Sequence, residues 1–339
     1  MFKIIDGHND LLLNMWLHYP NQPEKFVRGL KGDLDLPRIQ QAGMVAGLFA
    51  IFIPPAHLLN HPRYAEHRRM LEEPRKVMWQ QLDILRQIER CSQGKARICT
   101  TVAQIEQCIQ QGSFAMVAHI EGADALDEEG QQLHHFYEQG VRSLGPFWNL
   151  PNAFGYGVDG CYPQTPDTGL GLTSKGKRLI KLLNKKKMLI DVSHMNLKGF
   201  WDTAEYSQQP IVATHSSAWA ITAQPRNLLN SQLAAIVQSQ GLVGVNFGCP
   251  FIRPDGLRTT ATPLSMIVDH VVFLLGKVGE DFVAFGSDFD GVPIPRQLAG
   301  VGGMPKLIQL LQQRGLSEAA IEKLCYKNWL RVLKSIWGE

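Results

Sequence analysis

Short apolar runs recur along the chain, and each of them predicts a buried β-strand. The runs are rich in β-branched and aromatic residues and cover residues 3–7, 45–53, 114–120, 141–145, 188–192, 210–214, 242–246 and 282–287. They are too short for a typical helix, and their continuous apolar character indicates strands that are covered on both faces. We therefore expect eight parallel strands.

Stretches with helical hydrophobic spacing fill the intervals between the runs. They predict helices over residues 75–90, 101–110, 174–187, 231–240 and 263–277, and two more after the last strand, over 304–313 and 317–337, with Ser317 as the N-cap. Eight strands that alternate with helices are typical of an α/β fold of the (β/α)8 TIM-barrel type. We expect residues 1–339 to form a single barrel domain, with the helices at about 304–337 packing on it.

Composition and charge argue against several classes of function and location for this chain. The chain has 34 basic and 31 acidic residues, a net charge of +3, which does not favour nucleic acid as a partner. The longest apolar stretch, residues 42–56, contains two prolines and is too short to span a membrane. Six scattered cysteines without a Cys-x-x-Cys pair, and no export signal at the amino terminus, predict a cytoplasmic protein with reduced thiols.

Polar residues with metal-binding or catalytic chemistry follow the predicted strands. In a (β/α)8 barrel the carboxyl ends of all strands meet at one rim, where the active site lies. Side chains that are far apart in the sequence are therefore expected to converge there. The candidates are His8 and Asp10 after the first strand, Glu121 after the third, His194 after the fifth, His215 after the sixth and Asp288 after the eighth. His8 and Asp10 are separated by one residue, so on an extended backbone we expect their side chains to point the same way and to bind one cation.

The number of candidate ligands favours two metal ions. Three imidazoles and two carboxylates exceed what one tetrahedral catalytic ion binds while it keeps a position open for water. If Glu121 bridges, one ion has His8 and Asp10 and the other has His194 and His215. Zinc is the first candidate, with manganese and iron as alternatives. A hydroxide between the ions would be the nucleophile, and Asp288 the group that shuttles its proton.

An ordered set of short motifs spans nearly the whole chain. The motifs are Asp6-Gly7-His8-Asn9-Asp10, Gly32-Asp33-Leu34-Asp35-Leu36-Pro37, Ile120-Glu121-Gly122, Asp191-Val192-Ser193-His194, Thr214-His215-Ser216-Ser217, Arg226-Asn227, Gly286-Ser287-Asp288-Phe289-Asp290-Gly291 and Asn328-Trp329-Leu330-Arg331-Val332. This set resembles the membrane (renal) dipeptidases, the M19 metallopeptidases among the amidohydrolase-like barrels, in a bacterial form.

The resemblance implies a binuclear zinc site with two ions per subunit and the same five ligands. It also implies that Asp288 shuttles the proton, that a D-residue at the carboxyl end of the substrate is tolerated, and that the protein is a homodimer. It further implies that Arg226 holds the free carboxylate of a dipeptide. Arginine suits this task because its planar fork can donate two parallel hydrogen bonds, although a salt bridge on the rim is the alternative.

One position departs from the family pattern. Mammalian-type members have a histidine after the fourth strand that contacts the scissile carbonyl, and Trp148 aligns with it here. Trp148 is a candidate substrate-binding residue, as a pocket wall or as a hydrogen-bond donor. His119 shares the face of Glu121 and either replaces the missing histidine or is a core residue. Asp290 either orders the metal ligands or caps a turn.

These observations predict a metallo-dipeptidase that cleaves dipeptides with a free carboxyl terminus. Because of Trp148, one alternative is an amidohydrolase that acts on another small amide or an N-acyl amino acid. The other alternative is a metal-bound barrel that binds without catalysis, against which the presence of Asp288 argues.

Overall fold

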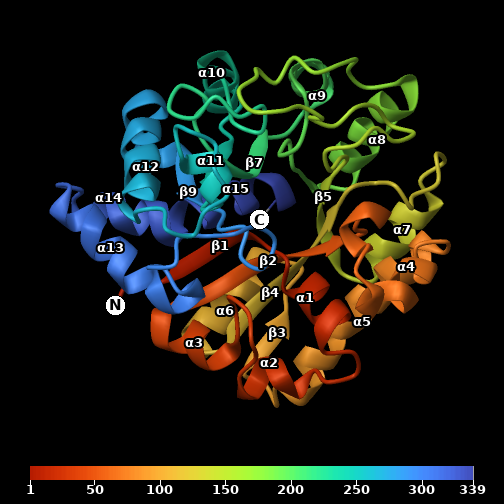
Figure 1. Cartoon of the computed structure of the whole chain (residues 1–339), viewed down its shortest axis with the longest axis horizontal. Helices are drawn as coiled ribbons and strands as arrows, with labels where there is room; N and C mark the ends of the chain where they lie inside the picture. Colours follow the sequence, from red (N-terminus) through yellow and green to blue (C-terminus); the bar gives the residue numbers. More distant parts are fainter. Residues whose placement is uncertain (339) are drawn as a thin grey trace.

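Eight parallel strands form a nearly closed barrel in the computed structural model, which describes residues 1–338 (Figure 1). In chain order they are β1 (Ile4–Asn9), β2 (Met44–Phe52), β4 (Phe114–Glu121), β5 (Val141–Gly145), β6 (Leu189–Ile190), β7 (Val212–Ser216), β8 (Leu242–Val245) and β9 (Val283–Phe285). Hydrogen bonds join them in the order β6-β5-β4-β2-β1-β9-β8-β7. A parallel bridge between Asp191 and Val212 joins the two ends, so the predicted TIM-barrel fold is confirmed.

A ninth strand, β3 (Ala96–Ile98), was not expected from the sequence. It pairs with Phe114–Met116 at the beginning of β4, whereas β5 pairs with residues 118–121 at its end. The two short strands thus share the edge of β4 that β2 does not occupy. Three residues with an exposed arginine in the middle are too few to produce a hydrophobic pattern.

Five predicted helices are present with ends shifted by a few residues. They are α5 (Pro74–Cys91), α6 (Val102–Gln111), α8 (Ser174–Lys185), α10 (Asn230–Gln238) and α12 (Ser265–Val278). The sequence did not predict α1 (Leu11–His18), α2 (Glu24–Arg28), α3 (Leu36–Ala42), α4 (Ala65–Met70), α7 (Gln131–Glu138), α9 (Leu197–Tyr206) and α11 (Cys249–Ile252). Four of these helices have seven residues or fewer, and α1 is apolar around most of its circumference, so they show no clear helical period. Helices α7 and α9 are amphipathic, and the sequence reading missed them.

The carboxyl-terminal segment closes the amino-terminal end of the barrel. Helix α13 (Met304–Gln313) matches its prediction, but the next predicted helix is divided into α14 (Glu318–Glu322), a π-helical turn over Lys323–Lys327 and α15 (Asn328–Trp337). Ser317 caps α14 by accepting a hydrogen bond from the backbone N of Ala320. Side chains of α15 share a core cluster with interior residues of the strands, among them Ile5, Ala115, Leu189, Val212, Leu242 and Ala284. No helix within residues 1–338 is both long and apolar enough to cross a bilayer.

Trp329 is the side chain by which α15 fills the barrel. It is fully buried, its Nε1 donates a hydrogen bond to the carbonyl of Phe285 (2.9 Å), and its ring lies where a Cβ on Gly7 would be. We expect Trp329→Ala to lower the free energy of unfolding by about 3–5 kcal/mol, because it leaves a large cavity. Trp201→Ala is the control, since that ring is 42% exposed. Urea unfolding of both variants measures the difference, and equal losses would contradict this role of Trp329.

Candidate metal centre and substrate cavity

The five predicted ligands converge at the carboxyl-terminal mouth of the barrel. His8 belongs to β1, Glu121 is the last residue of β4, His215 belongs to β7, and Asp10 and His194 follow β1 and β6. None of the five residues is more than 7% exposed. His8 Nε2 lies 3.6 Å from Asp10 Oδ2 and 3.7 Å from Glu121 Oε2. The barrel therefore brings together side chains that lie more than two hundred residues apart, such as His8 and His215.

Asp10 reaches this point differently from the sequence-based expectation. The alternation of an extended strand predicts that His8 and Asp10 point the same way, but β1 ends at Asn9, and Asp10 is the N-cap residue of α1 with φ −103° and ψ 28°. The strand is also irregular between Asp6 and Asn9. The turn into α1, rather than strand alternation, thus brings the two side chains together.

Hydrogen bonds fix the tautomers of the two other histidines. His194 Nδ1 lies 2.7 Å from Asn149 Oδ1, and because a carbonyl oxygen only accepts, Nδ1 carries the proton. Thr214 Oγ1 donates to Asp191 Oδ2, so it accepts from His215 Nδ1 at 2.8 Å. In both neutral rings, Nε2 is therefore left with a lone pair.

Both of these lone pairs lie close to the same carboxylate oxygen, Oε1 of Glu121. His194 Nε2 and His215 Nε2 are 3.1 Å apart, and they lie 2.9 Å and 3.5 Å from Glu121 Oε1. Three electron-rich atoms at these distances repel one another unless a positive charge lies between them. Imidazole nitrogen and carboxylate oxygen are common ligands of divalent transition metals, so the donor set fits such an ion.

A second group of side chains can also supply ligands to a metal ion. His8, Asp10 and Glu121 each offer one ligand atom, and these atoms lie within 4.8 Å of one another, as do those of Glu121, His194 and His215. Both ring nitrogens of His8 are buried without a hydrogen-bond partner among the residues that the structure describes. A buried imidazole without any partner is costly, and a cation would satisfy it. Glu121 belongs to both groups, and the residues present therefore fit two ions.

Burial and charge perturb the ionisation of the cluster. Burial raises the pKa of Glu121 to about 8, although a positive charge on His8 acts to lower it. Burial alone would lower the pKa of His8, but the Glu121 and Asp10 carboxylates raise it to about 10. Burial lowers the pKa values of His194 and His215 well below the ordinary value. Perturbed groups of this kind gather where a protein binds ions or performs catalysis.

Asp288 lies beside the ligand cluster on the segment that follows β9. Asn246 Nδ2 donates a hydrogen bond to its Oδ2 (2.8 Å), and burial raises its pKa to about 6. Its backbone has a left-handed φ of 62°. Gly291 permits the approach of this segment, because a Cβ there would lie 2.1 Å from Asp10 Oδ2. Asp288 is thus a carboxylate that faces the candidate ligands from a position fixed by Asn246.

A cavity of about 360 Å³ opens over the cluster. Its polar lining includes Asp10, Glu121, His194, Asp288, Asn149 and Arg258, and its apolar lining includes Leu13, Phe52, Leu58, Trp148, Phe251 and Val292. The Trp148 ring lies 5.5 Å from the Phe52 ring and 6.0 Å from His194. Trp148 therefore forms part of the wall next to a candidate ligand. The size is that of a pocket for a small molecule.

Arg226 approaches the same cluster from a buried position. Its Nη2 donates to the carbonyl of His215 (3.3 Å), whereas Nε and Nη1 are buried without a partner. Its guanidinium lies 5.5 Å from the Phe251 ring, which lines the cavity. Burial lowers the pKa of Arg226, whereas the negative charges of Asp288 and Glu121 act in the opposite direction. Two unsatisfied donors are available for an anion.

His119 and Asp290 lie outside the cavity lining. His119 is fully buried, with Nδ1 2.8 Å from Ser143 Oγ and Nε2 3.6 Å from Asp191 Oδ2. Asp290 Oδ1 accepts hydrogen bonds from Asn14 Nδ2 and from the backbone N of Asp33. These contacts place His119 beneath the site and make Asp290 a link between two loops.

Sequence reasoning missed the residues that orient the candidate site. Asn149 and Thr214 fix the two histidine tautomers, and Asn246 holds Asp288. Asn246 directly follows β8, so the same strand-end rule that identified the ligands could have found it. Asn149 and Arg258 lie on loops, where no periodic pattern marks them.

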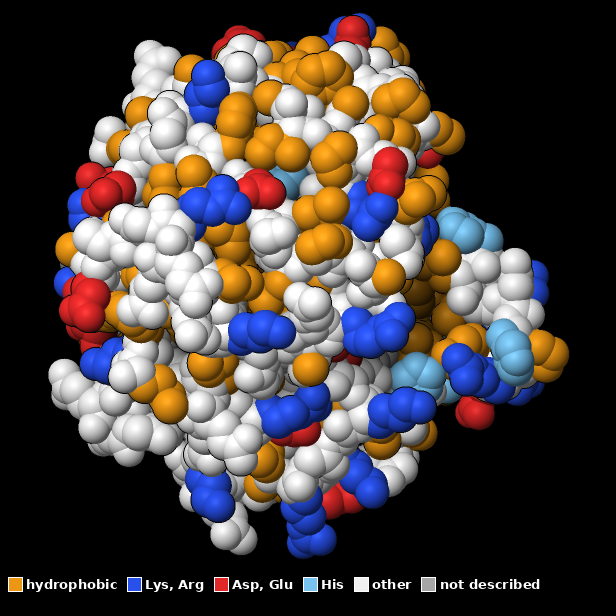
Figure 2. Space-filling view, turned by 60° about the vertical axis from the view of Figure 1, so that its left-hand side comes forward, with side chains coloured by type: hydrophobic (Ala, Val, Ile, Leu, Met, Phe, Trp, Pro, Cys, Tyr) orange, Lys and Arg blue, Asp and Glu red, His pale blue; other side chains and the backbone are white. Residues whose placement is uncertain are grey.

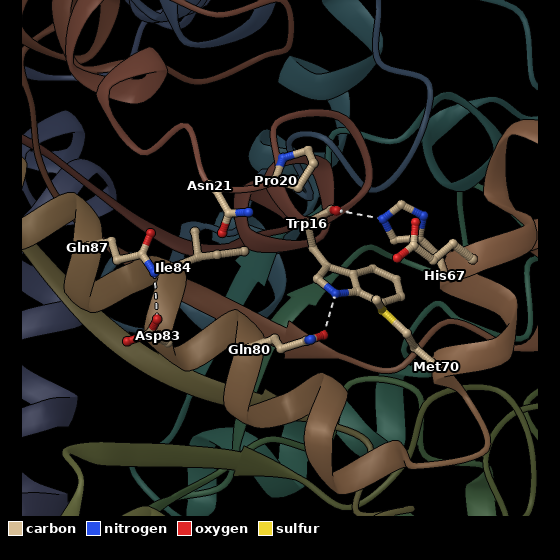
Figure 3. Close-up of a pocket in the computed structure, with 10 residues that line it drawn as sticks. Trp16, Pro20, Asn21, His67, Met70, Gln80, Asp83, Ile84 and Gln87 are labelled. Atoms are coloured by element: carbon tan, nitrogen blue, oxygen red, sulfur yellow. Dashed lines mark hydrogen bonds between the residues drawn. The ribbon is translucent and has the colours of Figure 1, made fainter.

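The histidine-rich segment between β2 and α5 forms a separate lobe. Figure 2 shows histidine and basic side chains gathered on this projection, which carries His57, His61, His67, Arg63, Arg68 and Arg69. A hollow lies where it meets α1 and α5, and there His67 Nε2 donates to the carbonyl of Trp16, and Trp16 Nε1 donates to Gln80 (Figure 3). Within residues 1–338 no candidate metal group includes these histidines.

His270 on α12 anchors the loop that carries Arg226. Its Nδ1 accepts from the backbone N of Ala218 (3.1 Å), and its Nε2 lies 3.3 Å from the carbonyl of Ile252. Burial lowers its pKa to about 4, so the folded protein keeps the ring neutral.

We expect His270 to make the fold acid-sensitive. Its folded pKa is lowered from 6.5, so this contribution to stability is complete above about pH 6.5 and is lost as the pH falls toward 4. Between pH 7 and pH 5 the loss amounts to about 2 kcal/mol. Urea unfolding at both pH values should show a smaller pH effect for His270→Gln than for the parent. The exposed His57→Gln is the control, and an unchanged pH effect in His270→Gln would contradict the expectation.

The chain is similar over nearly its whole length to proteins of one peptidase family. The family model of membrane dipeptidases, peptidase family M19, matches residues 1–337. A metallo peptidase from Rhodobacter sphaeroides, crystallised with a phosphinate mimic of the dipeptide L-Ala-D-Ala, is 38% identical, with a TM-score of 0.93 and 99% of each chain covered.

Two curated sequences are also similar. An uncharacterized protein of the pqqA 5′ region of Klebsiella pneumoniae is 53% identical over 267 residues, which are 79% of this chain and 98% of that protein. The dipeptidase tcpJ of Claviceps purpurea is 27% identical over 335 residues, which are 98% of this chain and 76% of that protein.

Proposed function

Since this chain belongs to the membrane dipeptidase family, peptidase family M19, and is a metallo-dipeptidase, we propose that it hydrolyses dipeptides with a free carboxyl terminus at a two-metal site. The observation that carries this proposal is the place of Glu121 between two groups of ligand atoms. The residues that would hold the ions are His8, Asp10, Glu121, His194 and His215. Zinc is the first candidate for both.

The orienting residues support this role. Asn149 and Thr214 keep the Nε2 lone pairs of His194 and His215 turned toward Glu121. Bound divalent ions would polarise the scissile carbonyl and lower the pKa of water. Asp288 is not needed as a ligand in this arrangement, and its carboxylate can accept a proton and pass it to the leaving amine. Asn246 holds it in place for both transfers.

The cavity accounts for the size and charge of the proposed substrate. Arg226 lies behind the lining residue Phe251, and its guanidinium keeps unpartnered donors that would bind the terminal carboxylate of a dipeptide. Trp148 and Phe52 supply an apolar wall. Tolerance of a D-residue at the carboxyl end is proposed from the relative that was crystallised with a mimic of L-Ala-D-Ala.

A substrate panel tests the proposal. Protein loaded with zinc or manganese is assayed on L,L- and L,D-dipeptides and, in parallel, on N-acyl amino acids. We expect turnover of dipeptides in both stereochemical series. Cleavage of N-acyl amino acids alone would instead identify an amidohydrolase, and no turnover of any compound by metal-loaded protein would contradict the proposal.

A further inference from the structure

One guanidinium at the mouth of the cavity has no partner within the described residues 1–338. Arg258 lines the cavity together with Asp10, Glu121 and Asp288, and its side chain is exposed. In the part of the chain that the structure describes, no hydrogen bond or ion pair joins its side chain to another residue. The lining thus contains a cation that the protein itself leaves unneutralised.

The loop that carries Arg258 is held at several points. Before it, the Arg253 guanidinium pairs with Asp255, and the same carboxylate accepts from the backbone N of Leu257 (3.1 Å). After it, the backbone N of Arg296 donates to the carbonyl of Thr260 (2.8 Å). Contacts on both sides hold the backbone of the loop, so the position of Arg258 at the cavity is set before a ligand binds.

Phe251 connects the cavity that Arg258 lines with the buried guanidinium of Arg226. The Phe251 ring lies 5.5 Å from the Arg226 guanidinium, and it lines the cavity together with Arg258. If Arg226 holds the terminal carboxylate, the side chain of that same substrate residue extends along Phe251. A carboxylate is the group that a guanidinium binds best, because two parallel hydrogen bonds add to the attraction of opposite charges.

We propose that Arg258 selects dipeptides with an aspartate or glutamate at the carboxyl-terminal position by binding its side-chain carboxylate. This inference rests on the proposed dipeptidase function and names its substrate class. The substrate would then carry two carboxylates, one for each arginine. Divalent ions bound by the candidate ligands would neutralise the lining carboxylates, so that an acidic substrate would meet no net repulsion in the cavity.

A pair of matched substrates measures what the second carboxylate contributes to kcat/KM. Ala-Asp and Ala-Asn have nearly the same shape and differ in one charge. For the metal-loaded parent we expect kcat/KM to be about tenfold higher for Ala-Asp, the effect of one charge-assisted contact. Arg258→Gln should bring this ratio close to one, and Arg258→Lys should restore part of it. Arg296→Gln, an exposed arginine on the neighbouring segment outside the cavity lining, should keep the ratio of the parent.

The outcomes separate this inference from the proposed function. Equal cleavage of Ala-Asp and Ala-Asn by the parent, or an unchanged ratio in Arg258→Gln, overturns the role of Arg258 and leaves the dipeptidase intact. A preference for Asp-Ala over Asn-Ala without one for Ala-Asp overturns the assignment to the carboxyl-terminal position. If the metal-loaded parent cleaves no dipeptide, both proposals fail together.

Discussion

Glu121→Gln is expected to abolish both metal binding and hydrolysis. Oε1 of this carboxylate lies 2.9 Å from His194 Nε2, and Oε2 lies 3.7 Å from His8 Nε2, so one side chain serves both ligand groups. An amide has no charge and turns an NH2 group toward one of the two groups. Loss of an outer-shell partner alone costs about 10- to 100-fold in metal affinity. Loss of the shared ligand should therefore exceed about 100-fold.

Elemental analysis of the purified variant and kcat/KM on a dipeptide measure this effect together. Glu129→Gln, an exposed carboxylate on the loop after β4, is the control and should retain metal and turnover. Thermal unfolding distinguishes loss of metal from loss of fold, because added zinc should raise the Tm of the parent and not that of Glu121→Gln. A Glu121→Gln protein with full metal content would refute the bridging role.

Asp288→Asn is expected to lose turnover while it keeps its metal. The asparagine oxygen can still accept the hydrogen bond from Asn246 Nδ2, so the geometry of the segment is preserved. An amide cannot accept a proton at neutral pH, and a positioned acid or base contributes about 10²- to 10⁴-fold to the rate. We expect kcat to fall by about that factor with unchanged metal content.

Asp290→Asn is the matched control for this substitution. Asp288 is buried and Asp290 is half-buried, and both lie on the same segment with a left-handed backbone, with φ of 62° for Asp288 and 65° for Asp290. The Asp290 amide oxygen can keep the hydrogen bonds from Asn14 and the Asp33 backbone. Its activity should stay near that of the parent. If both variants lose turnover equally, disturbance of the segment and not proton transfer explains the loss.

Strand prediction succeeded because burial on two faces makes a strand apolar throughout. The runs at 114–120 and 141–145 correspond closely to β4 and β5. The run at 188–192 was longer than the strand, since β6 has only two residues. Asp191 directly follows β6 and still forms a single bridge to Val212, and its side chain accepts hydrogen bonds from the backbone N of Ser193 and of Thr214. A side chain that takes the place of strand hydrogen bonds leaves the hydrophobic pattern unchanged.

The candidate ligands could be named from the sequence because a barrel places every strand end at one rim. That rule does not depend on distance along the chain, so it applies equally to His8 near the amino terminus and to Asp288 near the carboxyl terminus. It does not identify a residue on a long loop, and Asn149 and Arg258 were therefore missed. Nor does it distinguish His119 from Glu121, which share one face of β4. Only the environment shows that Ser143 and Asp191 surround His119.

The sequence by itself determined the barrel, the family and the identity of the polar groups at its rim. These follow from local hydrophobic patterns and from residue types, which are properties of short segments. Only the tertiary structure decided which nitrogen of His194 and of His215 carries its lone pair toward Glu121, and that Asp10 turns inward from a helix start. It also decided that Arg258 lines the cavity without a partner among residues 1–338. Tautomers and charge pairing depend on distances of a few ångströms between segments that are remote in the chain, because hydrogen bonds and short-range electrostatics act across space.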